Sequence, residues 1–156
     1  MNQFFRYFAI DVGGLARLAE ILPEAAARHG KRTALIIGDR HLSFSELDAL
    51  SNKVAIGLVA LGVMPGDRVS LFGGNSWEWV AAYHGIAKTG AVLNPLSSML
   101  TTDELRYTIG DAGARVVVAA SDKIEQLQAI KTDGIVDHLV PWTAAITGER
   151  QRWRPG

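Results

Sequence analysis

The sequence predicts an α/β fold with a mainly parallel sheet and βαβ crossovers. Short β-branched or apolar runs alternate with amphipathic stretches of about 10 to 15 residues, the pattern of strand–helix–strand units with right-handed connections. The run at 116–120 shows no polar alternation, which is typical of a strand covered on both faces. Glycine follows one amphipathic stretch after another. These observations favour a sheet buried between helices.

The order of these signals gives the expected elements. Helices are expected near residues 15–29, 45–61, 76–89, 102–112 and 122–131. Strands are expected at residues 33–37, 68–72, 91–93, 115–119 and 137–140. Residues 41–44 are predicted to pair with the first strand as a hairpin across the turn 38–40.

The helix at 45–61 has the clearest start signal. Ser43 can accept a hydrogen bond from the backbone N–H of Glu46 while Glu46 reaches back, and Leu42 and Leu47 are placed for a hydrophobic staple. The apolar residues of this helix recur at intervals of three and four, which predicts one buried face: Leu47, Leu50, Val54, Leu58 and Leu61.

Two further helices begin with cap signals. Thr101 and Glu104 repeat the capping box, and Asn75 with Glu78 three residues on predicts an N-cap for the helix at 76–89. Four of the expected helices are followed by a glycine, which can adopt the left-handed conformation that ends a helix: Gly30, Gly62, Gly90 and Gly113.

Composition narrows the class of protein. A chain of 156 residues suits one compact domain, and its 16 basic and 16 acidic residues give no basic excess for binding nucleic acid. The absence of cysteine excludes disulfides, thiolate metal sites and cysteine nucleophiles, and it fits a reducing, cytoplasmic compartment.

The two ends of the chain differ from its middle. No apolar run approaches the roughly 20 residues that cross a bilayer. The aromatic segment 4–10 is interrupted by Arg6. We interpret it as a segment that packs against the protein, and a segment that contacts a membrane surface is the alternative. After Pro141 the apolar period stops, so we expect an α/β portion at 1–141 and an irregular C-terminal tail at 142–156.

The loop at 71–76 is the first candidate for phosphate binding, because it leaves a strand and enters a helix N-terminus. Neither the GxxxxGK[ST] nor the GxGxxG pattern occurs in the chain. A tight turn capped by Asn75 is therefore the favoured interpretation. Gly13 and Gly14 also precede a helix, but no convincing strand comes before them, so we interpret them as a hinge or turn.

Other reactive residues also have structural interpretations. We favour a packed His84 over a ligand contact, because no carboxylate lies three or four residues on. Lys88 lies in the last turn of a helix, where a cation interacts favourably with the dipole. Asp67 and Arg68 suit a local ion pair or Asx turn after a Pro–Gly pair, and Ser76 suits a helix start better than a nucleophile elbow.

Metal binding is not expected, because the spacing of the histidines matches no metal motif: His29, His41, His84 and His138. If any segment lines a pocket, the loop from Asn94 to Leu100 is the best candidate, since it is expected at the carboxyl edge of the sheet.

Four stretches occur in one order and spacing: LSFSEL at 42–47, GVMPGDRV at 62–69, NSWE at 75–78 and KTGAVLNP at 88–95. Together they resemble the opening segment of the adenylate-forming ligases, the AMP-dependent acyl-CoA and aryl-CoA synthetases. The resemblance covers roughly residues 16–120 and implies the fold of the N-terminal part of the ligase large domain. Members of this family activate a carboxylate with ATP and Mg²⁺ as an acyl-adenylate and usually transfer it to coenzyme A, and fatty acid metabolism is the expected setting.

The matched residues are caps, turns and apolar helix faces. The family's Ser/Thr/Gly-rich phosphate loop and its catalytic lysine have no counterpart in this sequence, so no catalytic, cofactor-binding or metal residue is assigned. We therefore expect an N-terminal fragment or truncated member of an acyl-CoA ligase that binds no cofactor and is inactive alone.

Two alternatives remain open at this point: an interaction module that keeps the ligase scaffold, and an unrelated nucleotide-binding α/β domain. The expected partners are a second copy or the missing ligase segments, with the N-terminal aromatic residues or an edge strand buried between chains.

Overall fold

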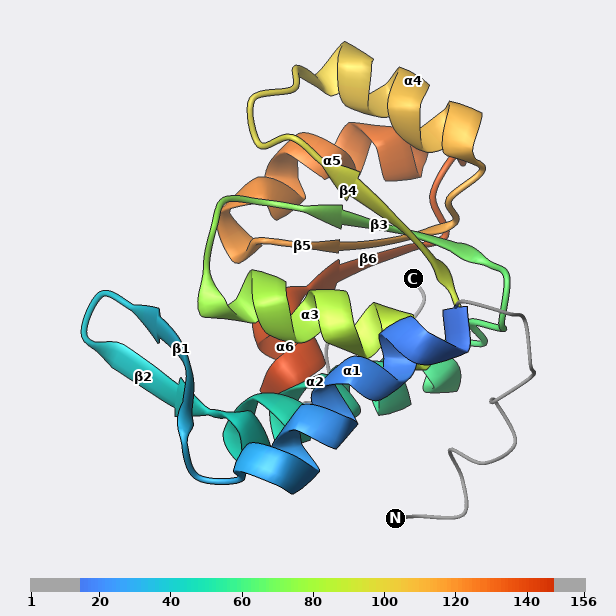
Figure 1. The fold of residues 1–156 in the computed structure, drawn as a ribbon. Coiled ribbons are helices and arrows are strands. Elements are labelled where there is room, and N and C mark those ends of the chain that lie inside the picture. The colour runs from blue at the N-terminus through green and yellow to red at the C-terminus, as the bar shows by residue number, and fades with distance from the viewer. Residues whose placement is uncertain (1–14, 148–156) are drawn as a thin grey trace.

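The computed structural model describes residues 15–147 of the chain (Figure 1). Its helices are α1 (Leu15–His29), α2 (Phe44–Ala60), α3 (Trp77–Lys88), α4 (Thr102–Ala112), α5 (Ile124–Thr132) and α6 (Trp142–Thr147), and a 3-10 turn, η2 (Ser121–Lys123), precedes α5. Its strands are β1 (Thr33–Ile37), β2 (Arg40–Ser43), β3 (Arg68–Phe72), β4 (Val92–Leu96), β5 (Val116–Ala119) and β6 (His138–Pro141). Within this range, no helix combines the length and apolar character needed to span a bilayer.

Four strands form one parallel sheet in the order β4-β3-β5-β6. Val69 in the central strand β3 pairs with Leu93 of β4 on one side and with Val116 of β5 on the other. The predicted α/β fold with a mainly parallel sheet is therefore confirmed. Strands β1 and β2 form the predicted antiparallel hairpin, which lies apart from the main sheet (Figure 1).

Helices cover both faces of the sheet. Helices α4 and α5 lie on one face, while α3 and α6 lie on the other with α2 and α1 packed beyond them (Figure 1). Each face has its own cluster of buried apolar side chains. All four residues of β5 are buried, as the unbroken apolar run at 116–120 predicts.

The local start signals of α2 and α4 are confirmed. Ser43 Oγ accepts from Glu46 N at 3.2 Å, and the Ser43 backbone N–H donates to the Glu46 carboxylate at 2.8 Å. These bonds to Ser43 lower the pKa of the Glu46 carboxyl. Thr101 and Glu104 form the same capping box at α4. The four glycines expected to end helices have φ angles of 51° to 88°.

Most element boundaries lie within two residues of the prediction, and two differences change an assignment. The N-cap of α3 is Ser76, whose Oγ accepts from Trp79 N at 3.2 Å, so the prediction of Asn75 was wrong by one residue. The two residues are adjacent good cap formers, and the sequence does not distinguish them. Strand β4 continues to Leu96 instead of ending near residue 93.

The C-terminal part differs more. Residues 142–147, expected to be irregular, form helix α6, because Trp142, Ala144, Ala145 and Ile146 are buried. A short segment with no clear apolar period is helical here through tertiary packing. The rest of the predicted tail, 148–156, lies outside the described residues, as do the aromatic segment 4–10 and the pair Gly13 and Gly14.

Candidate functional site

The strand order identifies where a sheet of this kind would bind a ligand. The chain passes from β3 to β4 on one side and then crosses over to β5 on the other side of β3. The direction of winding thus changes between β3 and β5, and the crevice beyond their carboxyl ends is the usual ligand site of an open α/β sheet.

Trp142 of α6 occupies this position. At the ends of β3 and β5, the Ala120 N–H donates to the Phe72 carbonyl at 2.9 Å. A Cβ added to Gly73 would lie 2.5 Å from Trp142 Cη2 and 3.0 Å from the Ala120 Cβ, and only 6% of Trp142 is exposed. The indole therefore fills the space beside Gly73, which explains why no side chain is tolerated there.

Hydroxyl side chains lie around this position. The first turn of α3 is capped by Ser76, and Ser121 Oγ lies 3.1 Å from Thr143 Oγ1 across the β5 and β6 loops. Among residues 15–147, no group of three or more His, Cys, Asp or Glu is arranged to hold a metal ion.

The loop predicted to line a pocket is tied to the sheet and to α5. Asn94 lies within β4, and its Nδ2 donates to the buried Ser70 Oγ at 3.0 Å. Gln126 Nε2 donates to the Leu100 carbonyl at 3.1 Å. Asn94 is thus engaged with the neighbouring strand, and Met99 between these anchors is 89% exposed.

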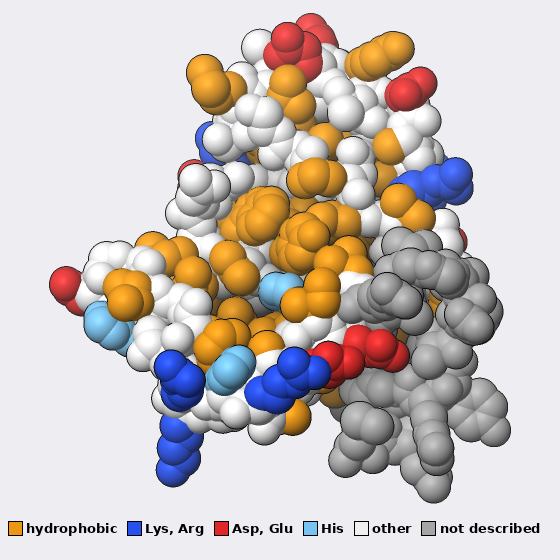
Figure 2. All heavy atoms as spheres, in the orientation of Figure 1, with side chains coloured by type: hydrophobic (Ala, Val, Ile, Leu, Met, Phe, Trp, Pro, Cys, Tyr) orange, Lys and Arg blue, Asp and Glu red, His pale blue; other side chains and the backbone are white. Residues whose placement is uncertain are grey.

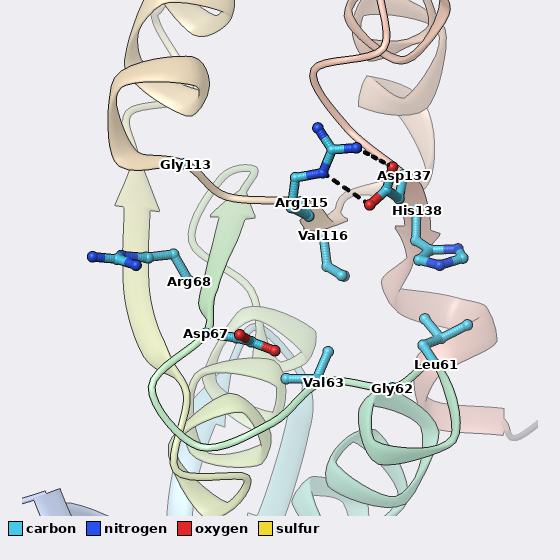
Figure 3. A pocket seen from close by; sticks show the side chains of 10 residues that line it. All are labelled: Leu61, Gly62, Val63, Asp67, Arg68, Gly113, Arg115, Val116, Asp137 and His138. Carbon is cyan, nitrogen blue, oxygen red and sulfur yellow. Dashed lines mark hydrogen bonds and ion pairs between the residues drawn. The ribbon is translucent and has the colours of Figure 1, made fainter.

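A cavity of about 260 Å³ lies at the opposite, amino edge of the sheet (Figure 3). Arg115 binds both carboxylate oxygens of Asp137 there, through Nε at 2.9 Å and Nη2 at 2.5 Å. Its Nη1 also donates to the Gly134 and Ile135 carbonyls at 3.0 and 3.3 Å. This arginine therefore joins the start of β5 to the loop before β6.

Charged side chains around the cavity form hydrogen bonds with neighbouring segments of the chain. The hydrogen bond from Arg115 lowers the pKa of the Asp137 carboxyl, which makes it a poor proton acceptor. Asp67 Oδ2 accepts from the Met64 backbone N–H at 2.8 Å, three residues earlier, which is not the bond of an Asx turn. Among the described residues Asp67 and Arg68 form no ion pair, so neither predicted interaction is found. The Arg68 side chain points away from the other lining residues (Figure 3). The carboxylates of Asp67 and Asp137 are thus each engaged in hydrogen bonds that hold neighbouring segments together.

The environment of Lys88 differs from the prediction. Lys88 lies in the last turn of α3 as expected, but its side chain is only 4% exposed and points to α2. The ammonium donates to Asp48 Oδ1 at 2.6 Å, to Ser51 Oγ at 2.7 Å and to Asn52 Oδ1 at 2.7 Å. Burial lowers the pKa of Lys88, and the hydrogen bond and charge of Asp48 partly offset that shift. The dipole interpretation missed this network.

An aromatic surface lies on the exposed side of α3. Tyr83 stacks on Trp79 with ring centroids 5.5 Å apart and meets His84 edge-on at 5.3 Å. Burial, and then the Lys88 charge, lower the pKa of the half-buried His84, which favours its neutral form. At the start of the helix, the Arg40 guanidinium lies 3.8 Å from the Trp77 ring centroid. Figure 2 shows hydrophobic side chains gathered between α3 and the edge strand β4.

Comparison with known proteins identifies the family of the chain. A family model described as AMP-binding enzyme matches residues 22–154. A 3-[(3aS,4S,7aS)-7a-methyl-1,5-dioxo-octahydro-1H-inden-4-yl]propanoyl:CoA ligase of Mycobacterium tuberculosis is 39% identical over 106 residues, which is 68% of this chain and 20% of the relative. The long-chain-fatty-acid–CoA ligase FadD13 of the same organism is 34% identical over 60% of this chain and 18% of its own length. The chain thus spans about a fifth of these curated CoA ligases.

Solved structures give the same fold. A Mycobacterium tuberculosis fatty acyl CoA synthetase matches with a TM-score of 0.75 and 27% identity, over 89% of this chain and 29% of that one. The anthranilate CoA ligase AuaEII in complex with anthranoyl-AMP matches with a TM-score of 0.77 over the same shares, and its 24% identity supports the fold alone. With the family model covering most of the sequence, the chain belongs to the AMP-binding enzyme family, and its curated relatives include CoA ligases.

Proposed function

We propose that this chain supplies the N-terminal α/β portion of an ATP-dependent acid–CoA ligase and carries out no chemical step alone. One observation carries the proposal. The family match runs through 22–154, yet at the carboxyl ends of β3 and β5 the indole of Trp142 fills the space beside Gly73. The motifs that place the chain in the family are the ones that build caps, turns and buried strands.

The reaction proposed for a whole enzyme containing this unit has two steps. A carboxylic acid would be activated with ATP and Mg²⁺ as an acyl-adenylate with release of pyrophosphate, and the acyl group would then pass to the thiol of coenzyme A with release of AMP. The names of the curated CoA ligases support this reaction class. The groups that bind ATP, Mg²⁺ and coenzyme A are proposed to lie outside this chain. The role proposed for the chain is that of a rigid structural scaffold.

The aromatic surface of α3 suggests how the unit would meet other ligase segments or a second copy. Trp77, Trp79, Val80 and Tyr83 are half-buried, and in the described range strand β4 pairs with β3 only. Val92 on this strand is 40% exposed. Apolar surface beside an open strand edge favours association.

Pyrophosphate exchange tests the proposal. Purified 1–156 is incubated with ATP, Mg²⁺, labelled pyrophosphate and a panel of fatty and aromatic acids, with a full-length family CoA ligase as the positive control. We expect exchange at the level of the buffer blank. Carboxylate-dependent exchange that survives repurification would contradict the proposal.

A non-catalytic interaction module on the same scaffold is the second candidate, and the aromatic surface of α3 is the observation that favours it. Light scattering at micromolar concentration tests the association that both candidates expect, with a dimer or larger species as the predicted result. A monomeric 16.8 kDa particle would count against it. A stoichiometric partner that contains no ligase sequence would favour the module.

A further inference from the structure

The contact between α2 and α3 combines a polar and a steric constraint. The polar one is the Lys88 network, defined as Lys88 with its acceptors Asp48, Ser51 and Asn52. The three acceptors lie at positions i, i+3 and i+4 of α2, so they share one face within about one turn. Together they can accept all three hydrogens of the ammonium.

The steric constraint lies one turn earlier on α3. A Cβ added to Gly85 would lie 2.5 Å from the Val54 Cβ and 2.9 Å from the Ser51 carbonyl oxygen. The backbones approach so closely that a side chain at position 85 would push the helices apart. Residues 85 and 88 of α3 thus face neighbouring turns of α2.

Other alignments of the two helices would break both constraints. If α3 moved by one turn along α2, Lys88 would meet the set Phe44, Leu47 and Asp48, or the set Asn52, Ala55 and Ile56. Each set has one polar side chain in place of three. An ammonium buried with a single partner is costly, so these alignments are disfavoured far more strongly than loss of apolar contact would disfavour them.

Apolar packing alone discriminates less strongly between alternative alignments of α3 on α2. Val54, Ala55 and Leu58 on α2 and Ala81, Ala82 and Ile86 on α3 are all buried, and small or similar apolar side chains can pack in more than one alignment. We propose that the Lys88 network selects the alignment of α3 on α2 and adds little to the net stability of the fold. It thereby sets where α3 presents its aromatic surface.

The test separates alignment from stability. In Lys88→Met, the carboxylate and amide lose their cation, and we expect the folding equilibrium constant to fall about ten- to a hundredfold. In the double variant Asp48→Leu with Lys88→Met, both charges are removed, Ser51 Oγ keeps its hydrogen bond to the Asp48 carbonyl, and the half-buried Asn52 can bind water. The urea midpoint should therefore return close to that of the unchanged protein. Lys53→Met, at an exposed position of α2, is the matched control and should change neither property.

Alignment is measured by near-UV circular dichroism, to which Trp77 and Trp79 on α3 contribute, and by amide NMR resonances. We expect the double variant to keep its far-UV signal, to lose most of its near-UV signal and to show doubled or broadened resonances in α3. Lys53→Met should match the unchanged protein in both spectra.

Two results would overturn the proposal. A double variant with unchanged near-UV signal and a single set of resonances would show that apolar packing alone fixes the alignment. A double variant that fails to fold by far-UV signal, or whose midpoint stays as low as that of Lys88→Met, would show that the network is needed for stability.

Discussion

The two faces of the sheet are packed in different ways. The cluster beneath α4 and α5 is built from apolar side chains, and its ion pairs lie at the rim, where Arg106 binds Asp133 and Arg115 binds Asp137. Beneath α2 and α3, a lysine ammonium is buried within the helix contact. Apolar packing stabilises the first face but is non-directional, so it favours no single alignment of the helices strongly. Hydrogen bonds are directional, and those on the second face specify one alignment of α3 on α2.

The largest effect is expected on the second face. Trp142→Ala removes the indole beside Gly73 and leaves a cavity that the rigid strand ends cannot fill, so the free energy of unfolding should fall by about 3–5 kcal/mol. Urea titration measures the loss. Trp79→Ala, at a half-buried position, is the control. An equal loss of stability in Trp79→Ala would show that Trp142 is no better packed than a tryptophan at the surface.

A matched pair of leucines compares the two faces directly. Leu58 and Leu127 are both fully buried, one on each face. Leu58→Ala and Leu127→Ala should each cost about 2–5 kcal/mol in denaturant titration. A neutral Leu58→Ala would mean that the buried face of α2 is wrongly assigned.

The two capping boxes offer a smaller comparison. Ser43 begins α2 on one face and Thr101 begins α4 on the other, with the same pattern of bonds to a glutamate. Ser43→Ala and Thr101→Ala should each lower the free energy of unfolding by about 0.5–2 kcal/mol. Thermal denaturation with two-state analysis checks both. If one substitution has no effect, that helix start is held by packing and not by its cap.

The smallest effect concerns pH. The pKa of His84 is lower in the folded chain than its ordinary value of about 6.5, so the unfolded state binds more protons once the pH falls below that value. Its contribution to stability is complete above about pH 6.5 and is lost as the pH falls through the folded pKa. Urea midpoints between about pH 7 and 5.5 should show a slope that His84→Gln reduces. Equal slopes in the variant and the unchanged protein would contradict this assignment.

Sequence reasoning succeeded where the cause is local. The caps of α2 and α4 and the buried run in β5 each depend on residues a few positions apart, and these features are confirmed. The N-cap of α3 was wrong by one residue because Asn75 and Ser76 are both good cap formers.

The errors of larger consequence involve contacts between distant parts of the chain. Helix α6 forms because Trp142 packs against Gly73 in the loop after β3, and no periodicity within 142–147 reveals that contact. The Lys88 network joins residues 36 to 40 positions apart. Its one sequence signal was three polar residues at i, i+3 and i+4 of a helix that is otherwise largely apolar on that side.

The position of Trp142 also has a consequence for the order in which the protein can fold during synthesis. The last buried residue of the cluster beneath α4 and α5 is Val136, whereas the cluster beneath α2 and α3 includes Trp142 and Ile146. At about 5–20 residues per second, the roughly ten residues between these points take about half a second to two seconds to translate. For that interval the nascent chain can close one face of its sheet while the strand ends beside Gly73 remain open to solvent and chaperones.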